Sequence, residues 1–347
     1  MSRNRLAMSL ALAMLLAGPT AARAQLPALR TGEAIPRDLR EIYDRGLAYL
    51  VSKQNASGEW SGGGEQGPGV TGMALMVLLA SGEDPNFGLY AGQVRKALRS
   101  IIAQQNAGTG ILGPSMYHHG FAMLALAEAY GTVDDRNLYA AGEANRRTIG
   151  QALELAVRAA VTSQKKNSLG AWRYSPDSTD ADTSVSGAVL VGLLAARNAG
   201  IEVPDEAIDK AINYYTKMTS SSGQVGYSGL GGFGESTART SIAALVYAVA
   251  RRKDLPQFKA TLGSLTQKLE QPPEQSYLEY ARYYQAQALF QGDVQAWEKW
   301  NNLLVRQLKA TQAADGSFPS QFGPTVGTSL SLLALALNYR FLPIYER

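Results

Sequence analysis

The sequence predicts an all-α fold, an (α/α)6 toroid or barrel built from six helical hairpins. Two observations support this prediction. A short motif recurs in which a Gln at a helix end is followed by a glycine turn and an aromatic residue, and amphipathic helices alternate with helices that are apolar on nearly every face. An open helical solenoid is the alternative, but six hairpins is the number that closes into a ring. The clearest copies of the motif pair Gln54 with Trp60, Gln164 with Trp172 and Gln312 with Phe318.

The two kinds of helix predict an outer and an inner layer. In 148–164, Leu153, Val157 and Val161 share one face, as in a helix that is half buried. The segment 183–199 is apolar nearly all round and must be buried on every side, so the inner helices form a ring that the outer helices cover. With the outer helix first, the expected pairs are 37–54 with 70–81, 91–105 with 117–130, 148–164 with 183–199, 205–219 with 237–251, 257–270 with 276–291, and 295–312 with 326–340.

The motif residues are expected to hold hairpins together rather than to bind ligands. A Gln at a helix terminus can donate to carbonyl groups that the helix leaves free, and the aromatic ring packs over the turn. The connections from outer to inner helices are long and rich in glycine, for example 61–64 and 227–234. We expect these loops to gather on one face, at the mouth of a central cavity.

The first 24 residues have the pattern of a secretory signal peptide. Arg3 and Arg5 precede an apolar run at 6–17, and Ala22 and Ala24 form an A-x-A cleavage site. Residues 25–36 are then an N-terminal linker, and 37–347 are a single toroid domain. We expect an exported protein, periplasmic or secreted, with no membrane span once the signal is removed.

The composition excludes several kinds of site. The chain has no cysteine, which excludes disulfides, thiolate nucleophiles and thiolate metal ligands. Its two histidines are adjacent and point in different directions on a helix, so we expect neither a metal site nor a cofactor. Loss of residues 1–24 removes three arginines and no acid, which lowers the formal net charge from +4 to +1. No basic cluster predicts a nucleic-acid partner, and the sequence identifies no protein partner.

The motif copies resemble the QW-type repeats of the squalene cyclase and prenyltransferase β-subunit superfamily, in particular its exported bacterial repeat proteins. The resemblance covers nearly all of the chain after the signal and is carried by the motif copies, the segments 182–187 and 283–292, and the end at 342–345. It implies the toroid fold. Cyclases of this superfamily protonate an alkene with an Asp-x-Asp-Asp motif followed by Thr, whereas the matching place here reads Asp180-Ala181-Asp182-Thr183. Zinc prenyltransferases use a Cys ligand, which this chain lacks.

Polar residues near the starts of the inner helices are the candidates for a functional site. Each has a structural alternative: Asp182 can cap the first turn of the helix that follows it, tyrosines at helical spacing can be packing residues, and Arg239 can pair with an acid such as Asp182. The candidate catalytic groups are Asp180, Asp182, His118, His119 and Glu279, and the candidate ligand-binding groups are Tyr117, Asp182, Arg239, Tyr277 and Tyr280.

Three functions remain open at this point, and the sequence does not decide whether the protein is an enzyme. The leading hypothesis is binding of a small apolar or amphipathic, isoprenoid-like ligand in the central cavity, because the inner ring is apolar and the acid motif is incomplete. The alternative is a secreted carbohydrate-active enzyme, a glycosidase or polysaccharide lyase, which would use opposed carboxylates or a Tyr/His/Arg cluster. A divergent terpene cyclase is the further alternative.

Overall fold

The computed structural model describes residues 35–60, 64–140, 143, 146–271 and 274–345, and the unit Ile35–Arg347 forms one compact body. The expected signal peptide and nearly all of the expected linker lie outside the described residues. Within them, strand pairing is limited to isolated bridges. The helices are α1 (Arg37–Lys53), α2 (Pro68–Leu79), α3 (Ala91–Ala103), α4 (Met116–Ala129), α5 (Ile149–Gln164), α6 (Thr183–Asn198), α7 (Asp205–Met218), α8 (Thr237–Val249), α9 (Pro256–Gln267), α10 (Leu278–Gly292), α11 (Val294–Thr311) and α12 (Pro324–Ala336), with short 3-10 helices η1 (Asp135–Asn137) and η2 (Pro343–Tyr345).

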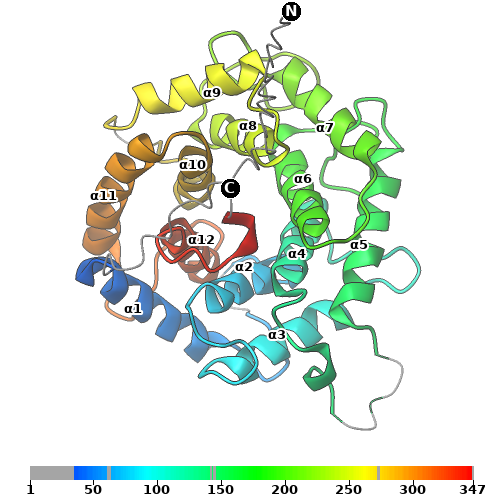
Figure 1. The fold of residues 1–347 in the computed structure, drawn as a ribbon, viewed down its shortest axis with the longest axis vertical. Coiled ribbons are helices and arrows are strands. Elements are labelled where there is room, and N and C mark those ends of the chain that lie inside the picture. Colours follow the sequence, from blue (N-terminus) through cyan, green and yellow to red (C-terminus); the bar gives the residue numbers. More distant parts are fainter. Residues whose placement is uncertain (1–34, 61–63, 141–142, 144–145, 272–273, 346–347) are drawn as a thin grey trace, which may run out of the picture. The chain divides into compact units, whose positions relative to one another are not determined.

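The even-numbered helices form a closed inner ring. Each contacts the next, from α2 through α4, α6, α8 and α10 to α12, and α12 contacts α2. The odd-numbered helices surround this ring (Figure 1). The predicted all-α toroid of six hairpins is therefore confirmed. No helix among the described residues has the length and apolar character needed to cross a membrane.

The burial of the two layers follows their sequences. Every residue of α2 is buried, whereas α1 buries one face that includes Leu39, Ile42 and Leu50. The inner helices approach one another closely because small residues lie at their contacts. At Gly120 of α4, an added Cβ would lie 2.6 Å from the backbone carbon of Ala188 in α6. A side chain at this position would force these two helices apart.

Proline sets the start of two inner helices earlier than the apolar pattern predicts. The helices α2 and α12 begin at Pro68 and Pro324, two residues before the predicted starts. Proline is well tolerated in the first turn of a helix, where an N–H group would have no helical partner. These helices also end earlier than predicted, at Leu79 and Ala336.

Four glutamines, at four of the six junctions between outer helices, join one outer helix to the next. Gln54 Nε2 donates to the turn carbonyl of Gly58 at 3.1 Å and to the carbonyl of Gln93 in α3 at 2.9 Å. The bond to the next helix goes beyond the expected bonds to free carbonyls, because it ties neighbouring hairpins together. The same pair of bonds, to the turn glycine and to the next outer helix, is made by Gln105, Gln164 and Gln312.

The last motif copy closes the ring. Gln312, after α11, donates to the carbonyl of Ile42 in α1 at 2.9 Å, across 270 positions of sequence. Its turn glycine, Gly316, has φ +89°, and an added Cβ would lie 2.3 Å from the carbonyl oxygen of Arg45. Glycine is required here both by the left-handed backbone and by the close approach to α1.

The end of the chain returns to the inner ring. Leu342 and Ile344 are buried, η2 contacts α6, and the backbone N–H of Ile344 donates to Oε2 of Glu128 in α4 at 3.2 Å. Figure 1 shows this segment in the middle of the ring of helices. The terminal segment therefore contributes to the core of the unit.

Candidate functional site

Asp182 caps inner helix α6 and keeps one carboxylate oxygen without a partner. Its Oδ1 accepts from the backbone N–H of Val185 at 2.8 Å, which is the bond of an N-cap. Its Oδ2 is buried and has no hydrogen-bond partner among the described residues. Burial raises the pKa of Asp182 to about 6, against the opposing effects of the Val185 N–H and the Arg173 charge. The helix-capping role thus uses Oδ1, whereas Oδ2 remains available for a ligand.

Asp180 lies in a different environment from Asp182. Its Oδ2 is 2.6 Å from Nη1 of Arg173, and its side chain is more than half exposed. The burial of Asp182 favours its protonated form, whereas Asp180 is exposed to solvent beside a guanidinium group. Two nearby carboxyl groups therefore lie in different environments.

A cluster of tyrosines lies next to Asp182. The hydroxyl groups of Tyr117, from α4, and Tyr280, from α10, are 3.3 Å apart, and the Tyr280 hydroxyl donates to the Ser184 carbonyl of α6 at 3.4 Å. Burial raises the pKa of Tyr117, and the nearby charge of Asp182 raises it further. The candidates Tyr117, Tyr280 and Asp182 are thus brought together, as three inner helices start around them.

Two further tyrosines extend this cluster toward the surface. The ring of Tyr174 lies 5.7 Å from the ring of Tyr117, and its hydroxyl is 3.0 Å from the hydroxyl of Tyr227. Sequence reasoning missed both residues because they lie in loops rather than at helical spacing. The position of Tyr174, two residues after the motif aromatic Trp172, is the signal that could have found it.

The axis of the ring is filled by aromatic side chains at this level. The helices α4 and α10 lie on opposite sides of the ring, and they meet through the Tyr117 and Tyr280 hydroxyls and through Phe121 and Tyr283, whose ring centroids are 6.0 Å apart. The open central cavity expected from the sequence is therefore replaced here by an aromatic floor, and the mouth around Asp182 lies at the loops above the inner helix starts.

A glycine-rich loop, 226–234, packs against Asp182. The N–H of Thr183 donates to the Tyr227 carbonyl at 2.8 Å, and the N–H of Gly229 donates to the Ala181 carbonyl at 3.4 Å. The same loop places Leu230 and Phe233 in solvent, at 59% and 49% exposure. Two large apolar side chains are thus exposed on the loop whose backbone bonds to Ala181 and Thr183.

The two histidines make structural contacts. His119 Nδ1 accepts from the Leu112 N–H at 3.1 Å, so its Nε2 carries the proton and donates to the Ala156 carbonyl at 3.0 Å. Burial lowers the pKa of His119 to about 4. His118 Nδ1 accepts from the Gly69 N–H, and its Nε2 lies 3.1 Å from Glu65. Both rings join α4 to its neighbours, and no cluster of three potential metal ligands occurs among the described residues.

The other three candidates lie apart from Asp182. Tyr277 is 53% exposed and stacks on Phe322 at 5.8 Å between ring centroids. Arg239 Nη2 lies 3.4 Å from the Gly234 carbonyl, and no ion pair of this arginine occurs among the described residues. Glu279 lies one turn before Arg282 in α10, and its charge raises the pKa of that arginine.

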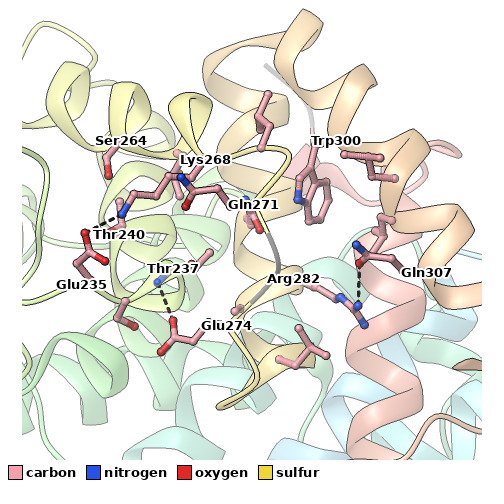
Figure 2. Close-up of a pocket in the computed structure, with 18 of the residues that line it drawn as sticks. Glu235, Thr237, Thr240, Ser264, Lys268, Gln271, Glu274, Arg282, Trp300 and Gln307 are labelled. Atoms are coloured by element: carbon pink, nitrogen blue, oxygen red, sulfur yellow. Dashed lines mark hydrogen bonds and ion pairs between the residues drawn. The ribbon is translucent and has the colours of Figure 1, made fainter.

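A cavity that the sequence did not predict lies between α8, α9, α10 and α11 (Figure 2). Its volume is about 370 Å³, and its walls include Glu235, Lys268, Arg282, Trp300 and Gln307. Polar side chains from four helices converge on it. It is separate from the mouth, since none of its lining residues belongs to the Asp182 cluster.

Comparisons with known proteins support the fold. No family model and no curated protein matches the chain. Among solved structures, the type II terpene cyclase MstE from Scytonema has a TM-score of 0.62 at 14% identity, over 88% of this chain and 99% of that chain. The GH76A α-1,6-mannanase from Salegentibacter sp. HEL1_6 has a TM-score of 0.63 at 11% identity, over 86% of this chain and 98% of that chain. At this level of identity the likeness shows the α/α toroid fold alone.

Proposed function

We propose that the mouth around Asp182 binds a small amphipathic ligand that has a polar head and an apolar, isoprenoid-like chain. The observation that carries the proposal is the Asp182 carboxyl group, whose buried Oδ2 lacks a partner and which packs against the loop 226–234. A buried acceptor without a hydrogen bond costs free energy, and a hydroxyl on the ligand would supply that bond.

The surroundings of Asp182 suit the remainder of such a ligand. The rings of Tyr117 and Tyr174 form an aromatic surface, and Leu230 and Phe233 add exposed apolar side chains. An apolar chain laid on this surface would remove it from water, at about 25 cal/mol for each Å² covered. One structure of the terpene cyclase MstE holds geranylgeranyl dihydroxybenzoate, an isoprenoid-bearing molecule, which supports this choice of ligand class by analogy of fold.

Asp182 is better suited to binding than to protonating an alkene. Burial makes Asp182 a weaker acid, with a pKa of about 6, whereas alkene protonation needs a strong acid. If Asp182-Thr183 matches the last Asp and the Thr of the cyclase motif, the buried Ala181 replaces the central acid; if Asp180 and Asp182 match its first and third positions, Thr183 replaces the last acid. We therefore propose binding without cyclisation.

Binding of tritiated geranylgeraniol to the purified protein tests the proposal. In Asp182→Asn the helix cap is retained, because Asn caps helices as well as Asp does. We expect this variant to bind about ten- to a hundredfold more weakly, because a hydrogen bond to a charged group is lost. Asp293 caps α11 in the same way, with Oδ1 accepting from Ala296 at 3.0 Å, so Asp293→Asn is the matched control and should bind normally. Equal binding by all three proteins, or none by any, would refute the proposal.

Glycoside hydrolysis is the second candidate, and one observation favours it. Asp182, with its raised pKa, could act as an acid, while the exposed Asp180, which pairs with Arg173, could act as a base. The mannanase among the matching structures holds α-1,6-mannotriose in a variant with two aspartates replaced. Release of reducing ends from α-1,6-mannan, abolished in both Asp180→Asn and Asp182→Asn, would favour this function over binding.

Export is part of the proposal and rests on the pattern in residues 1–24. A protein recovered from the periplasm or medium of an expressing bacterium should begin at Gln25. N-terminal sequencing of the recovered protein checks this directly. A chain that keeps its first 24 residues and stays inside the cell would contradict the proposed export.

A further inference from the structure

The outer layer is joined differently at one junction, between α9 and α11. At the other five junctions a glycine of positive φ presses against the backbone or stem of the next outer helix. The connection 268–277, after α9, contains no glycine. The glycines at the five regular junctions are Gly58, Gly110, Gly170, Gly223 and Gly316.

The cavity of about 370 Å³ lies at this irregular junction. Its volume falls within the range of about 300–1,000 Å³ that is usual for small-molecule sites. Its walls come from the end of α9, the starts of α8 and α10, and the middle of α11. The missing glycine contact thus coincides with a space large enough for a ligand.

One wall of the cavity holds a buried guanidinium group that has no anionic hydrogen-bond partner. Arg282 is only 7% exposed. Its single hydrogen bond among the described residues runs from Nη2 to Oε1 of Gln307 at 2.8 Å, and its Nε is buried without a partner. Burial lowers the pKa of Arg282, and the charge of Glu279 offsets only part of that effect. A buried cation bonded only to a neutral amide is costly unless an anion joins it.

The other charged groups of the cavity are already engaged. In Figure 2, Lys268 Nζ lies 2.9 Å from Glu235, and a carboxylate oxygen of Glu274 accepts from the Thr237 N–H at 3.0 Å. Glu274 is exposed and bonds to a backbone N–H, so Arg282 is the buried cation of the wall that has no charged hydrogen-bond partner among the described residues.

Two neighbours of Arg282 indicate the rest of the ligand. Gln285, one turn along α10, lines the cavity and is 8% exposed, and its side chain makes no hydrogen bond among the described residues. Trp300 of α11 also lines the cavity and offers the flat surface of an indole. A guanidinium fork matches a planar carboxylate, an amide can bond to a second polar atom, and an indole packs on a flat apolar body.

We infer that this cavity binds a small organic carboxylate with a flat or apolar body, held by Arg282 and packed against Trp300. The site is independent of the mouth at Asp182. Inorganic phosphate could pair with Arg282 but has no apolar body to pack against Trp300. A comparison of phosphate binding with carboxylate binding therefore distinguishes these two kinds of anion.

Calorimetric titration of the purified protein with benzoate, benzamide and inorganic phosphate tests the inference. We expect benzoate to bind at least about tenfold more tightly than benzamide, which has the same shape without the charge. We expect Arg282→Met to lose benzoate binding, while Arg197→Met, which removes an arginine paired with Asp205 at the surface, retains it. Benzoate binding that is unchanged in Arg282→Met, or phosphate binding without benzoate binding, would overturn the inference.

A second variant supplies the missing anion from within the chain. Gln307→Glu places a carboxylate beside Arg282, so it should raise the melting temperature and abolish benzoate binding. This outcome does not depend on whether Arg282→Met folds. The inference fails if Gln307→Glu binds benzoate as the parent protein does. It also fails if the parent protein does not bind benzoate at millimolar concentration.

Discussion

At the scale of single residues, the Asp182 carboxyl group makes stability depend on pH in an unusual direction. The pKa of Asp182 is about 6 in the folded chain, above the value of 3.8 expected without burial. The folded state therefore binds a proton more tightly than the unfolded state between about pH 4 and pH 6, and stability falls as pH rises through that window. The loss is complete about one pH unit above the folded pKa and amounts to on the order of 3 kcal/mol.

A comparison of Asp182→Asn with the parent protein isolates this effect. The Asn variant does not titrate, so its stability relative to the parent should increase by on the order of 2 kcal/mol between pH 4 and pH 7. Urea unfolding of both proteins at several pH values measures the difference, in which the other titrating groups cancel. A difference that is independent of pH would show that the carboxyl group is not buried as described.

His119 provides a second test at the residue scale. Its Nδ1 accepts from Leu112 and its Nε2 donates to Ala156, an arrangement that fits only the neutral ring. With a pKa lowered to about 4, the ring should remain neutral, protonated at Nε2, from pH 7 down to pH 5. Nitrogen-15 shifts of the imidazole report this directly, and a ring that titrates near pH 6.5 would contradict the description.

At the scale of elements, the turn glycines set how closely outer helices pack. Gly316 and Gly200 have nearly the same backbone conformation, with φ +89° and +91°. An added Cβ at Gly316 meets the Arg45 carbonyl oxygen, whereas nothing lies within 4 Å of one at Gly200. Gly200→Ala should cost only the backbone strain, about 1 kcal/mol, and Gly316→Ala should cost at least about 2 kcal/mol more. Chemical unfolding of both variants checks this, and equal costs would argue against the close approach.

The sequence predicts helices better than it predicts sites, for a physical reason. Apolar periodicity and the recurring Gln identify all twelve helices, because both depend on neighbouring positions along the chain. The copy at Gln105 is less visible in the sequence because Leu112 replaces the aromatic residue. Its side chain nevertheless donates to the carbonyls of Gly110 and Ala152, as the other motif glutamines do at their junctions. The same local reasoning finds Asp182, since a helix cap is a local feature.

The remainder of the sites depends on contacts between distant elements. Tyr117 and Tyr280 meet across 163 positions, so their partnership needs the closed ring. The cavity at Arg282 lies at the junction where 268–277 contains no turn glycine, and the absence of a residue type gives no positive sequence pattern. Arg282 is a candidate ligand-binding residue because it is buried without an anionic hydrogen-bond partner. That property exists only in the folded chain.

At the scale of the whole molecule, the chain end should be part of the folding unit. Ile344 is 4% exposed and its N–H bonds to Glu128 in α4, whereas the nearby Phe341 is 53% exposed. Ile344→Ala should lower the free energy of unfolding by about 2–4 kcal/mol, and Phe341→Ala by less than about 1 kcal/mol. Thermal and urea unfolding measure both, and a reversed order would show that the terminal segment does not belong to the core.

At the scale of the whole molecule, we propose two separate places where a ligand binds. The mouth is formed by the starts of inner helices and includes Asp182, and the cavity beside Arg282 lies between inner helices α8 and α10 and outer helices α9 and α11. The two places differ in chemistry, because one offers a buried acid among aromatic rings and the other a buried cation. A ligand with an apolar chain and a hydroxyl head should therefore choose the mouth.

Photo-crosslinking tests this central claim most directly. An isoprenoid alcohol that carries a diazirine can be irradiated with the purified protein, and the modified peptides can be identified by mass spectrometry. We predict adducts in the segments 173–182 and 226–234, and we expect unlabelled geranylgeraniol to prevent them. Adducts confined to other segments, or adducts that competitor does not reduce, would contradict a binding site at Asp182.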